Sequence, residues 1–389
     1  MDILKTVLRA WGIGTLSVLG ALVGGFLMWF VVKAVLEPRG AALSACVAEV
    51  ACQFTVVNGS ASVRVVGFSD DGRYLITKGS DTLIHRADSG DRVARINPDF
   101  SPFELKFMGQ IPEVAAVGRE TITFYDYGGN LLRTWSADAD EKTTGFVALP
   151  NLNGFALAQD DGITFYRLSD GQAFTTLPNS QGMTQLTVSE EGLVLAAYHG
   201  ATQSLHIWPL NNLEGAVVIP HGREIRDLVH TNLQISRDGS LIAAHSNNTA
   251  YVWRTVDGTL LQSFHQPDFT ITAISLAKSG SHLAIGYDDG FAEVWSLTEA
   301  NMVQQFEHRR GIFGLALSPD ANQLAVGLSR DTSTRQITAS ERDLARRQYQ
   351  QGQRVNTADR FLTPNTTYVS TRPGFGIVWE VSATSDTTP

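Results

Sequence analysis

The chain has 389 residues, of which 43% are apolar and 18% are charged, and its formal net charge at pH 7 is -9. This apolar content supplies a buried core and excludes an intrinsically disordered chain. The acidic balance argues against nucleic acid as a partner. The 35 Gly and 13 Pro residues are typical of a turn-rich β protein.

Residues 10–32 are a run of 23 residues without a charged side chain. A helix of this length, at 1.5 Å per residue, spans a hydrocarbon core of ~30 Å. The run is longer than the apolar region of a signal peptide, although Leu43–Cys46 resembles a lipoprotein processing box and leaves cleavage as an alternative. We therefore predict a single-pass membrane protein with a short cytoplasmic tail (1–9), a linker (33–52) and a large domain on the extracytoplasmic, periplasmic side.

Small residues form a strip along this predicted helix: Ser17, Gly20, Ala21, Gly24 and Gly25. Such a strip lets a second helix approach closely, which predicts packing against another membrane subunit. The alternative is that Gly is simply frequent in membrane helices.

Cys46 and Cys52 are the two cysteines of the chain. On the exported side a disulfide between them would persist. In extended chain they would lie ~20 Å apart, so the bond requires a turn between them. A disulfide and two unpaired thiols both remain open.

One short pattern, a β-branched or aromatic residue followed by a ring, recurs through the rest of the chain. The ring residues are His85, Tyr125, Tyr166, Trp208, Trp253, Trp295 and Trp379. The first six follow one another at intervals of 40 to 45 residues, and the last comes after 84. This period, with one packing anchor per unit, indicates propeller blades of four strands each.

The residues around these anchors resemble the WD-repeat β-propellers, in which Gly-His precedes the first strand of a blade and Trp-Asp closes the third. The chain keeps the His at His221, His265 and His308, without the Gly. Four anchors are Trp, and only Tyr125-Asp126 retains the acid. The resemblance covers residues 54–381 and implies an all-β, seven-bladed propeller, with departures in the family's side-chain hydrogen-bond network. It says little about function.

The chain ends define how the predicted ring closes. Residues 53–57 look like a strand with no blade of its own, and only eight residues follow Val381. We expect the propeller to occupy 53–382, with 53–57 as the outer strand of the last blade, which removes the open sheet edges. The remaining segments are an insertion (329–374) within the last blade and a tail (383–389).

The insertion is basic on an otherwise acidic propeller, with eight Arg, no Lys and four acidic residues. Arg offers bidentate pairing, so a docking element for an acidic partner or for anionic lipid is one interpretation. Its candidate partner-binding residues are Arg335, Arg342, Arg346, Arg347, Tyr349 and Arg354. The alternative is a solvated loop that folds back on the acidic face of the propeller.

Motifs for catalysis are absent from the sequence: there is no phosphate-binding Gly loop, no Cys-x-x-Cys and no His-x-x-x-His. We expect no catalytic residue, no cofactor and no metal. His245 and His282 fall near equivalent positions of adjacent blades, where packing is favoured over metal binding. The acidic pairs Asp70-Asp71 and Asp288-Asp289 are expected to cap hairpins.

The sequence thus predicts a membrane-anchored, non-enzymatic scaffold or accessory subunit that mediates protein–protein interaction in a membrane complex, with lipid contact through one helix. The first alternative is a membrane-tethered sensor that binds a small ligand at the propeller channel. A second is an enzyme with its site on the blade loops, which would require a cluster of titratable groups at one channel mouth.

Overall fold

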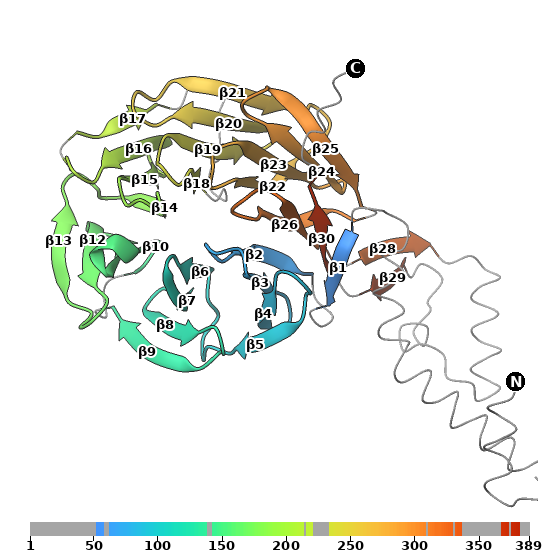
Figure 1. Ribbon diagram of the computed structural model, residues 1–389, viewed down its shortest axis with the longest axis horizontal. Coiled ribbons are helices and arrows are strands. Elements are labelled where there is room, and N and C mark those ends of the chain that lie inside the picture. The colour runs from blue at the N-terminus through green and yellow to red at the C-terminus, as the bar shows by residue number, and fades with distance from the viewer. Residues whose placement is uncertain are drawn as a thin grey trace, which may run out of the picture. The chain divides into compact units, whose positions relative to one another are not determined.

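The computed structural model describes residues 52–57, 62–137, 142–213, 215–220, 233–308, 310–329, 331–336, 367–372 and 375–381. Within these residues, seven four-stranded antiparallel sheets are arranged in a ring (Figure 1). The predicted all-β, seven-bladed propeller of four-stranded blades is confirmed. We call the strands of each blade a to d, from the inside of the ring outwards.

The first four blades follow the chain in order. Blade 1 contains β2 (Arg64–Phe68), β3 (Tyr74–Lys78), β4 (Thr82–Arg86) and β5 (Arg92–Ile96). Blade 2 contains β6 (Glu104–Met108), β7 (Ile111–Val117), β8 (Thr121–Asp126) and β9 (Leu131–Ser136). Blade 3 contains β10 (Gly145–Leu149), the short 3-10 helix η1 (Pro150–Leu152), β11 (Gly154–Gln159), β12 (Gly162–Arg167) and β13 (Ala173–Leu177). Blade 4 contains β14 (Met183–Val188), β15 (Val194–His199), β16 (Ser204–Pro209) and β17 (Val217–Ile219).

The last three blades complete the ring. Blade 5 contains β18 (Gln234–Ile235), β19 (Leu241–Ser246), β20 (Thr249–Arg254) and β21 (Leu260–His265). Blade 6 contains β22 (Ile271–Leu276), β23 (His282–Tyr287), β24 (Phe291–Ser296) and β25 (Asn301–Glu307). Blade 7 contains β26 (Ile312–Leu317), β27 (Gln323–Leu328), β30 (Phe375–Glu380) and β1 (Cys52–Val57).

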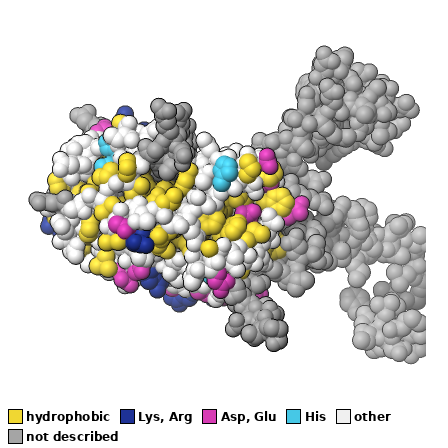
Figure 2. Space-filling model, turned by 90° about the horizontal axis from the view of Figure 1, so that it is seen from above, with side chains coloured by type: hydrophobic (Ala, Val, Ile, Leu, Met, Phe, Trp, Pro, Cys, Tyr) yellow, Lys and Arg dark blue, Asp and Glu magenta, His cyan; other side chains and the backbone are white. Residues whose placement is uncertain are grey.

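The core of the propeller lies between the blades. Each of the seven apolar clusters in the described chain joins two neighbouring blades. Because the middle strands are covered on both faces, their sequences are apolar runs; every residue of β11, for example, is buried. The outer strands instead leave alternate side chains exposed, and apolar side chains lie in patches across the rim (Figure 2).

The predicted anchor residues all lie on the third strand of their blades. Six of them lie in or against the apolar cluster that joins their own blade to the preceding blade: Tyr125, Tyr166, Trp208, Trp253, Trp295 and Trp379. His85 is 3% exposed, and its Nε2 lies 3.0 Å from Thr77 Oγ1. These rings are therefore part of the packing between blades.

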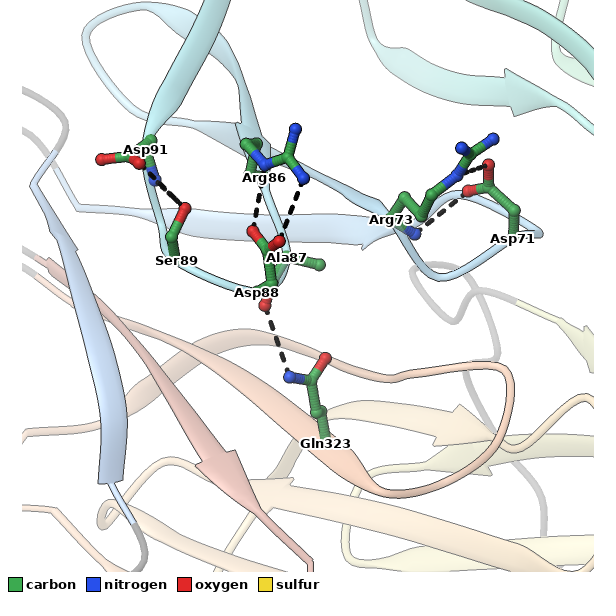
Figure 3. A network of polar contacts seen from close by, with 8 residues as sticks. All are labelled: Asp71, Arg73, Arg86, Ala87, Asp88, Ser89, Asp91 and Gln323. Atoms are coloured by element: carbon green, nitrogen blue, oxygen red, sulfur yellow. Dashed lines mark hydrogen bonds and ion pairs between the residues drawn. The ribbon is translucent and has the colours of Figure 1, made fainter.

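The two ends of the described chain meet in blade 7, where β1 pairs with β30 in the order β1-β30-β27-β26. Gln323 of β27 adds a link to blade 1. Its Nε2 donates to Gln53 Oε1 at 2.6 Å and to the carbonyl oxygen of Ala87 at 3.3 Å. The turn that holds Ala87 is braced by Arg86, whose guanidinium binds the Asp88 carboxylate at 3.0 Å and 3.1 Å (Figure 3).

The insertion in blade 7 begins and ends in two strands that the sequence analysis did not expect. β28 (Asp331–Gln336) and β29 (Thr367–Arg372) pair with each other in a separate two-stranded sheet. The polarity of this segment argued only against buried strands, and this hairpin is not part of any blade sheet. Arg335 lies on β28 opposite Tyr368.

The remaining predictions on the insertion and on both ends of the chain lie outside the described residues. They concern Arg342, Arg346, Arg347, Tyr349 and Arg354, the predicted helix 10–32 with its small-residue strip from Ser17 to Gly25, the linker up to residue 51 with Cys46, and the tails 1–9 and 383–389. The described chain contains no helix long and apolar enough to cross a membrane.

Candidate functional site

The turns that join strands a and b share one design in four blades. Their first residue is a buried Ser, whose Oγ accepts a hydrogen bond from the backbone N–H of the sixth residue at 2.9 to 3.1 Å. These serines are Ser69, Ser189, Ser236 and Ser318. The fourth residue has a positive φ and is Gly in three of the four turns.

The third residue of the turn stabilises it in blades 1, 5 and 7. The carboxylates of Asp71, Asp238 and Asp320 accept the Ser Oγ–H at 2.6 to 2.7 Å and the backbone N–H of the fifth residue at 3.0 to 3.2 Å. Burial alone would raise the pKa of Asp71, but these hydrogen bonds hold it below its usual value. The predicted capping role fits Asp71; it does not fit Asp70.

The second residue of each a–b turn is not needed to form the turn. In blades 1, 4, 5 and 6 this residue is charged: Asp70, Glu190, Arg237 and Lys278. Because the a strands line the inside of the ring, these turns meet around its axis. The sequence analysis missed these residues, and an alignment of the turns on their Ser and Gly would have revealed a charged residue at one repeated position.

A cavity of about 820 Å³ lies where these turns meet. We call it the mouth pocket. It is lined by residues from the a–b turns of blades 1 to 5, among them Asp70, Gln110, Asn151, Glu190 and Arg237, and by Tyr127 from the c–d turn of blade 2. A Cβ added to Gly109 would lie 3.2 Å from Asp70 Oδ2, so the absence of a side chain there leaves room for the Asp70 carboxylate.

Glu190 is the centre of the charged network. Its carboxylate lies 2.6 Å from Arg237 Nε and 2.8 Å from Lys278 Nζ, and its side chain is 13% exposed. Burial would raise the pKa of Glu190, but the two cations outweigh burial and lower it. Backbone hydrogen bonds run alongside, from Glu191 N–H to Arg237 and from Arg237 N–H to Lys278. The turns of blades 4, 5 and 6 are therefore held in one arrangement.

Asp70 approaches this network from the opposite side of the ring. Burial, the negative charge of Glu190 and a hydrogen bond shared with Glu190 raise the pKa of Asp70, against the opposing effect of Lys278 and Arg237. Two carboxyl groups of blades 1 and 4 thus face each other in the pocket. Their mutual repulsion favours a proton or another positive charge between them.

Aromatic rings form part of the wall beside Asp70. The ring centroids of Tyr74 and Tyr127 are 4.7 Å apart, and those of Phe107 and Tyr127 are 5.6 Å apart in an edge-to-face arrangement. Burial and the negative charges of Asp71 and Asp70 raise the pKa of Tyr127, so its hydroxyl stays protonated. The wall therefore presents neutral aromatic groups next to carboxylates.

The alternative of an enzyme with its site on the blade loops requires a cluster of titratable groups at one mouth of the channel, and the mouth pocket contains such a cluster. Among its charged groups, Glu190 is paired with Arg237 and Lys278, and Asp71 is paired with Arg73. The ion pairs at Glu190 join the turns of blades 4, 5 and 6, which gives this part of the cluster a structural role.

The expectation that His245 and His282 occupy near-equivalent strand positions is wrong. His245 is the fifth residue of β19, whereas His282 is the first residue of β23, so the two lie at opposite ends of their strands. The spacing of the repeats alone does not give the strand boundaries that separate the two positions. No group of three or more His, Cys, Asp or Glu side chains in the described chain is placed to hold a metal ion.

Comparison with known proteins supports the repeat assignment. The family model described as WD domain, G-beta repeat, matches residues 258–296, which run from the end of blade 5 through strand c of blade 6. The chain is 24% identical over 127 residues to the U3 small nucleolar RNA-associated protein 15 homolog of Gallus gallus, covering 32% of this chain and 24% of that protein. The Xenopus laevis homolog is 27% identical over 110 residues, covering 28% and 20%.

A third relative has a different name. The meiotic fizzy-related protein 2 of Schizosaccharomyces pombe is 25% identical over 179 residues, covering 43% of this chain and 33% of that protein. The chain thus spans a fifth to a third of the length of these relatives.

These findings correct the predicted location. A single-pass membrane protein with an extracytoplasmic propeller was expected from residues 10–32. The described residues contain no membrane-spanning helix, and the relatives include proteins named for a small nucleolar RNA, none of the three being named as a membrane protein. A membrane complex and a lipid partner are therefore not carried forward.

Proposed function

We propose that the chain is a non-enzymatic scaffold that mediates protein–protein interaction through its propeller. The observation that carries this proposal is the network at the mouth pocket, where ion pairs and backbone hydrogen bonds hold the turns of blades 4, 5 and 6 in one arrangement. A surface that is ordered before binding loses little conformational entropy when a partner docks. The WD repeat at 258–296 supports the same function.

The partner is a protein in this proposal. The net charge of -9 disfavours direct contact of the propeller with phosphate backbones. Some relatives are named for association with U3 small nucleolar RNA, and an interaction module can belong to such an assembly by binding its proteins.

The basic insertion is the second element of the proposed interface. Arg335, Arg342, Arg346, Arg347 and Arg354 supply guanidinium groups, and Tyr349 supplies an aromatic ring, for an acidic partner surface. The hairpin at the base of the insertion brings Gln336 and Thr367 opposite each other. The insertion can therefore be removed without displacing β27 or β30.

The test is co-purification with cross-linking of the full chain from its native host. In one variant, residues 337–366 are replaced by Asn-Gly, which closes a two-residue hairpin between β28 and β29. We expect this variant to keep the unfolding temperature of the unmodified protein and to lose at least one cross-linked partner. A matched variant with the five Arg changed to Lys keeps the charge and separates bidentate pairing from simple attraction. A chain that captures no protein in any form would overturn the scaffold proposal.

A second candidate function, binding of a small ligand at the propeller axis, is favoured by the mouth pocket itself. Its volume of about 820 Å³ is within the range of ligand sites. A thermal-shift screen of the purified chain tests it, because a ligand that binds only the folded state raises the unfolding temperature.

A further inference from the structure

We propose that the mouth pocket binds an organic cation, namely the guanidinium or ammonium group of a basic side chain on a protein partner. This inference rests on the scaffold function and assigns one contact to it. The pocket is formed by other residues than the basic insertion, since its lining comes from the a–b turns of blades 1 to 5 and from Tyr127.

The balance of charge in the pocket favours a cation over an anion as its ligand. Four carboxyl groups and two guanidinium groups line it: Asp70, Asp71, Glu190, Glu191, Arg73 and Arg237. Arg73 is bound to Asp71 at 2.6 Å, and Arg237 and Lys278 are both bound to Glu190. Among the ion pairs of the described residues, none includes Asp70 or Glu191. An entering anion would have to break existing ion pairs, whereas a cation would find two carboxyl groups to bind.

The carboxylate of Glu191 is not used to stabilise the turn in which it lies. In blades 1, 5 and 7 the third residue of the turn is an Asp that accepts the Ser Oγ–H. Blade 4 has Glu191 at this position, and there the N–H of the fifth residue, Leu193, donates to Ser189 Oγ at 3.1 Å and not to the side chain of the third residue. The longer side chain is thus not required by its own turn. Its carboxylate is exposed at the edge of the pocket.

Asp70 and the aromatic wall together favour an organic cation. Asp70 lies close to Glu190, so a positive charge beside it would relieve the repulsion between the two carboxyl groups. Tyr74 and Tyr127 line the same part of the pocket. Aromatic rings attract cations, and guanidinium groups also stack on them. Carboxylate and ring together select a flat or compact organic cation over a hydrated metal ion.

Hydrogen bonds order both sides of the pocket. Ser69 and Asp71 bind each other within the turn that carries Asp70, at 2.6 Å. The turns of blades 4, 5 and 6 are joined by backbone hydrogen bonds. Because both sides of the pocket are ordered before a ligand enters, little of the binding free energy is lost in ordering the site.

The experiment uses the full chain and titration calorimetry with three probes: a capped pentapeptide with a central Arg, the same peptide with neutral citrulline, and agmatine as a free guanidinium compound. Asp70→Asn and Glu191→Gln are the test variants. Asp268→Asn removes one exposed carboxylate from a d–a loop, on the other face of the propeller, and is the charge-matched control. Thermal unfolding of each variant verifies its fold.

We expect the Arg peptide to bind, the citrulline peptide to bind at least tenfold more weakly, and each test variant to weaken the Arg peptide about tenfold, with Asp268→Asn within twofold of the unmodified chain. Equal binding of both peptides, or binding unaffected by Asp70→Asn and Glu191→Gln, overturns the proposal. Binding of agmatine alone also overturns it, because the ligand would then be a free small molecule and not a side chain of a protein partner. Protein partners that co-purify equally with both test variants while no peptide binds would reject this site and leave the scaffold function standing.

Discussion

Glu190 and Lys278 meet across the blade that separates them, with Glu190 Oε1 of blade 4 lying 2.8 Å from Lys278 Nζ of blade 6. Arg237 of the intervening blade binds the same carboxylate at 2.6 Å. One acidic side chain therefore connects three blades at the axis of the propeller. The stability of the ring and the chemistry of the mouth pocket depend on the same group.

Glu190→Gln should lower the free energy of unfolding by about 1 to 2 kcal/mol, because two cations lose their common counter-charge while Arg237 and Lys278 remain partly solvated. Urea unfolding at neutral pH measures the loss. Glu191→Gln is the matched control, since it removes the neighbouring exposed carboxylate, and it should cost less than about 0.5 kcal/mol. Equal losses in both variants would contradict a special role for Glu190.

Asp70→Asn should stabilise the protein at neutral pH. The pKa of Asp70 is raised above 3.8 in the folded state, so the folded protein holds this proton more tightly than the unfolded chain. Its contribution to stability therefore falls as pH rises from 3.8 through the folded pKa, and the loss persists at pH 7. The gain from Asp70→Asn, measured by urea unfolding across pH 3.5 to 7.5, should shrink toward the acidic end. A variant that is destabilised equally at every pH would refute this.

Buried histidines should make the propeller sensitive to acid. Burial lowers the pKa of His245 and of His308 to about 4 in each case. As pH falls from 6.5 to about 4, the unfolded chain gains these protons and the folded state does not. Each group should then cost about 3 kcal/mol of stability. Urea unfolding between pH 7.5 and 4.5 should show a steep loss that His308→Gln reduces, and a slope unaffected by His308→Gln would contradict this.

Glu293 offers a test of buried polar packing in the repeat matched by the WD model. It is 7% exposed and accepts hydrogen bonds from Tyr287 Oη at 2.9 Å and Trp295 Nε1 at 3.0 Å. Glu293→Ala leaves these donors without that acceptor and should cost about 2 to 4 kcal/mol. Glu293→Gln keeps an acceptor oxygen and should cost less. Thermal unfolding of both, with Tyr287→Phe in a double-mutant cycle, measures the coupling; additive losses would contradict it.

The seam between blades 7 and 1 should be weaker without Gln323. Gln323→Ala removes hydrogen bonds to Gln53 and to the Ala87 carbonyl and should cost about 0.5 to 1.5 kcal/mol. Gln172→Ala, in an exposed turn of blade 3, is the control and should be close to neutral. Removal of residues 1–57 should cost more and cause self-association on size-exclusion chromatography, because the outer edge of β30 becomes unpaired.

The fold could be predicted because one ring per blade repeats at a nearly constant interval. Those rings are packing residues, and packing between structurally similar units requires a residue of the same kind at the same position of each unit. Ser69 and Asp71 likewise leave a readable turn pattern, since each acts on residues a few positions away. The two strands of the insertion hairpin left no such pattern, because they pair only with each other and belong to no blade that repeats.

The mouth pocket could not be predicted in the same way. Asp70 and Glu190 are brought together by closure of the ring, and neither has a partner nearby in the sequence that marks it. The sequence analysis grouped Asp70 with Asp71 because both occur in a turn, whereas only Asp71 is used by the turn. The direction of a side chain relative to the axis is decided by all seven blades together.

The pairing of β1 with β30 also bears on how this protein is made. A ribosome delivers residues 52–57 before the first six blades and residues 375–380 after them, so those blades emerge while β1 still lacks its partner. During that interval an apolar strand edge is open to other chains. The nascent propeller should therefore need protection until β30 is synthesised, and ring closure should follow the synthesis of all seven blades.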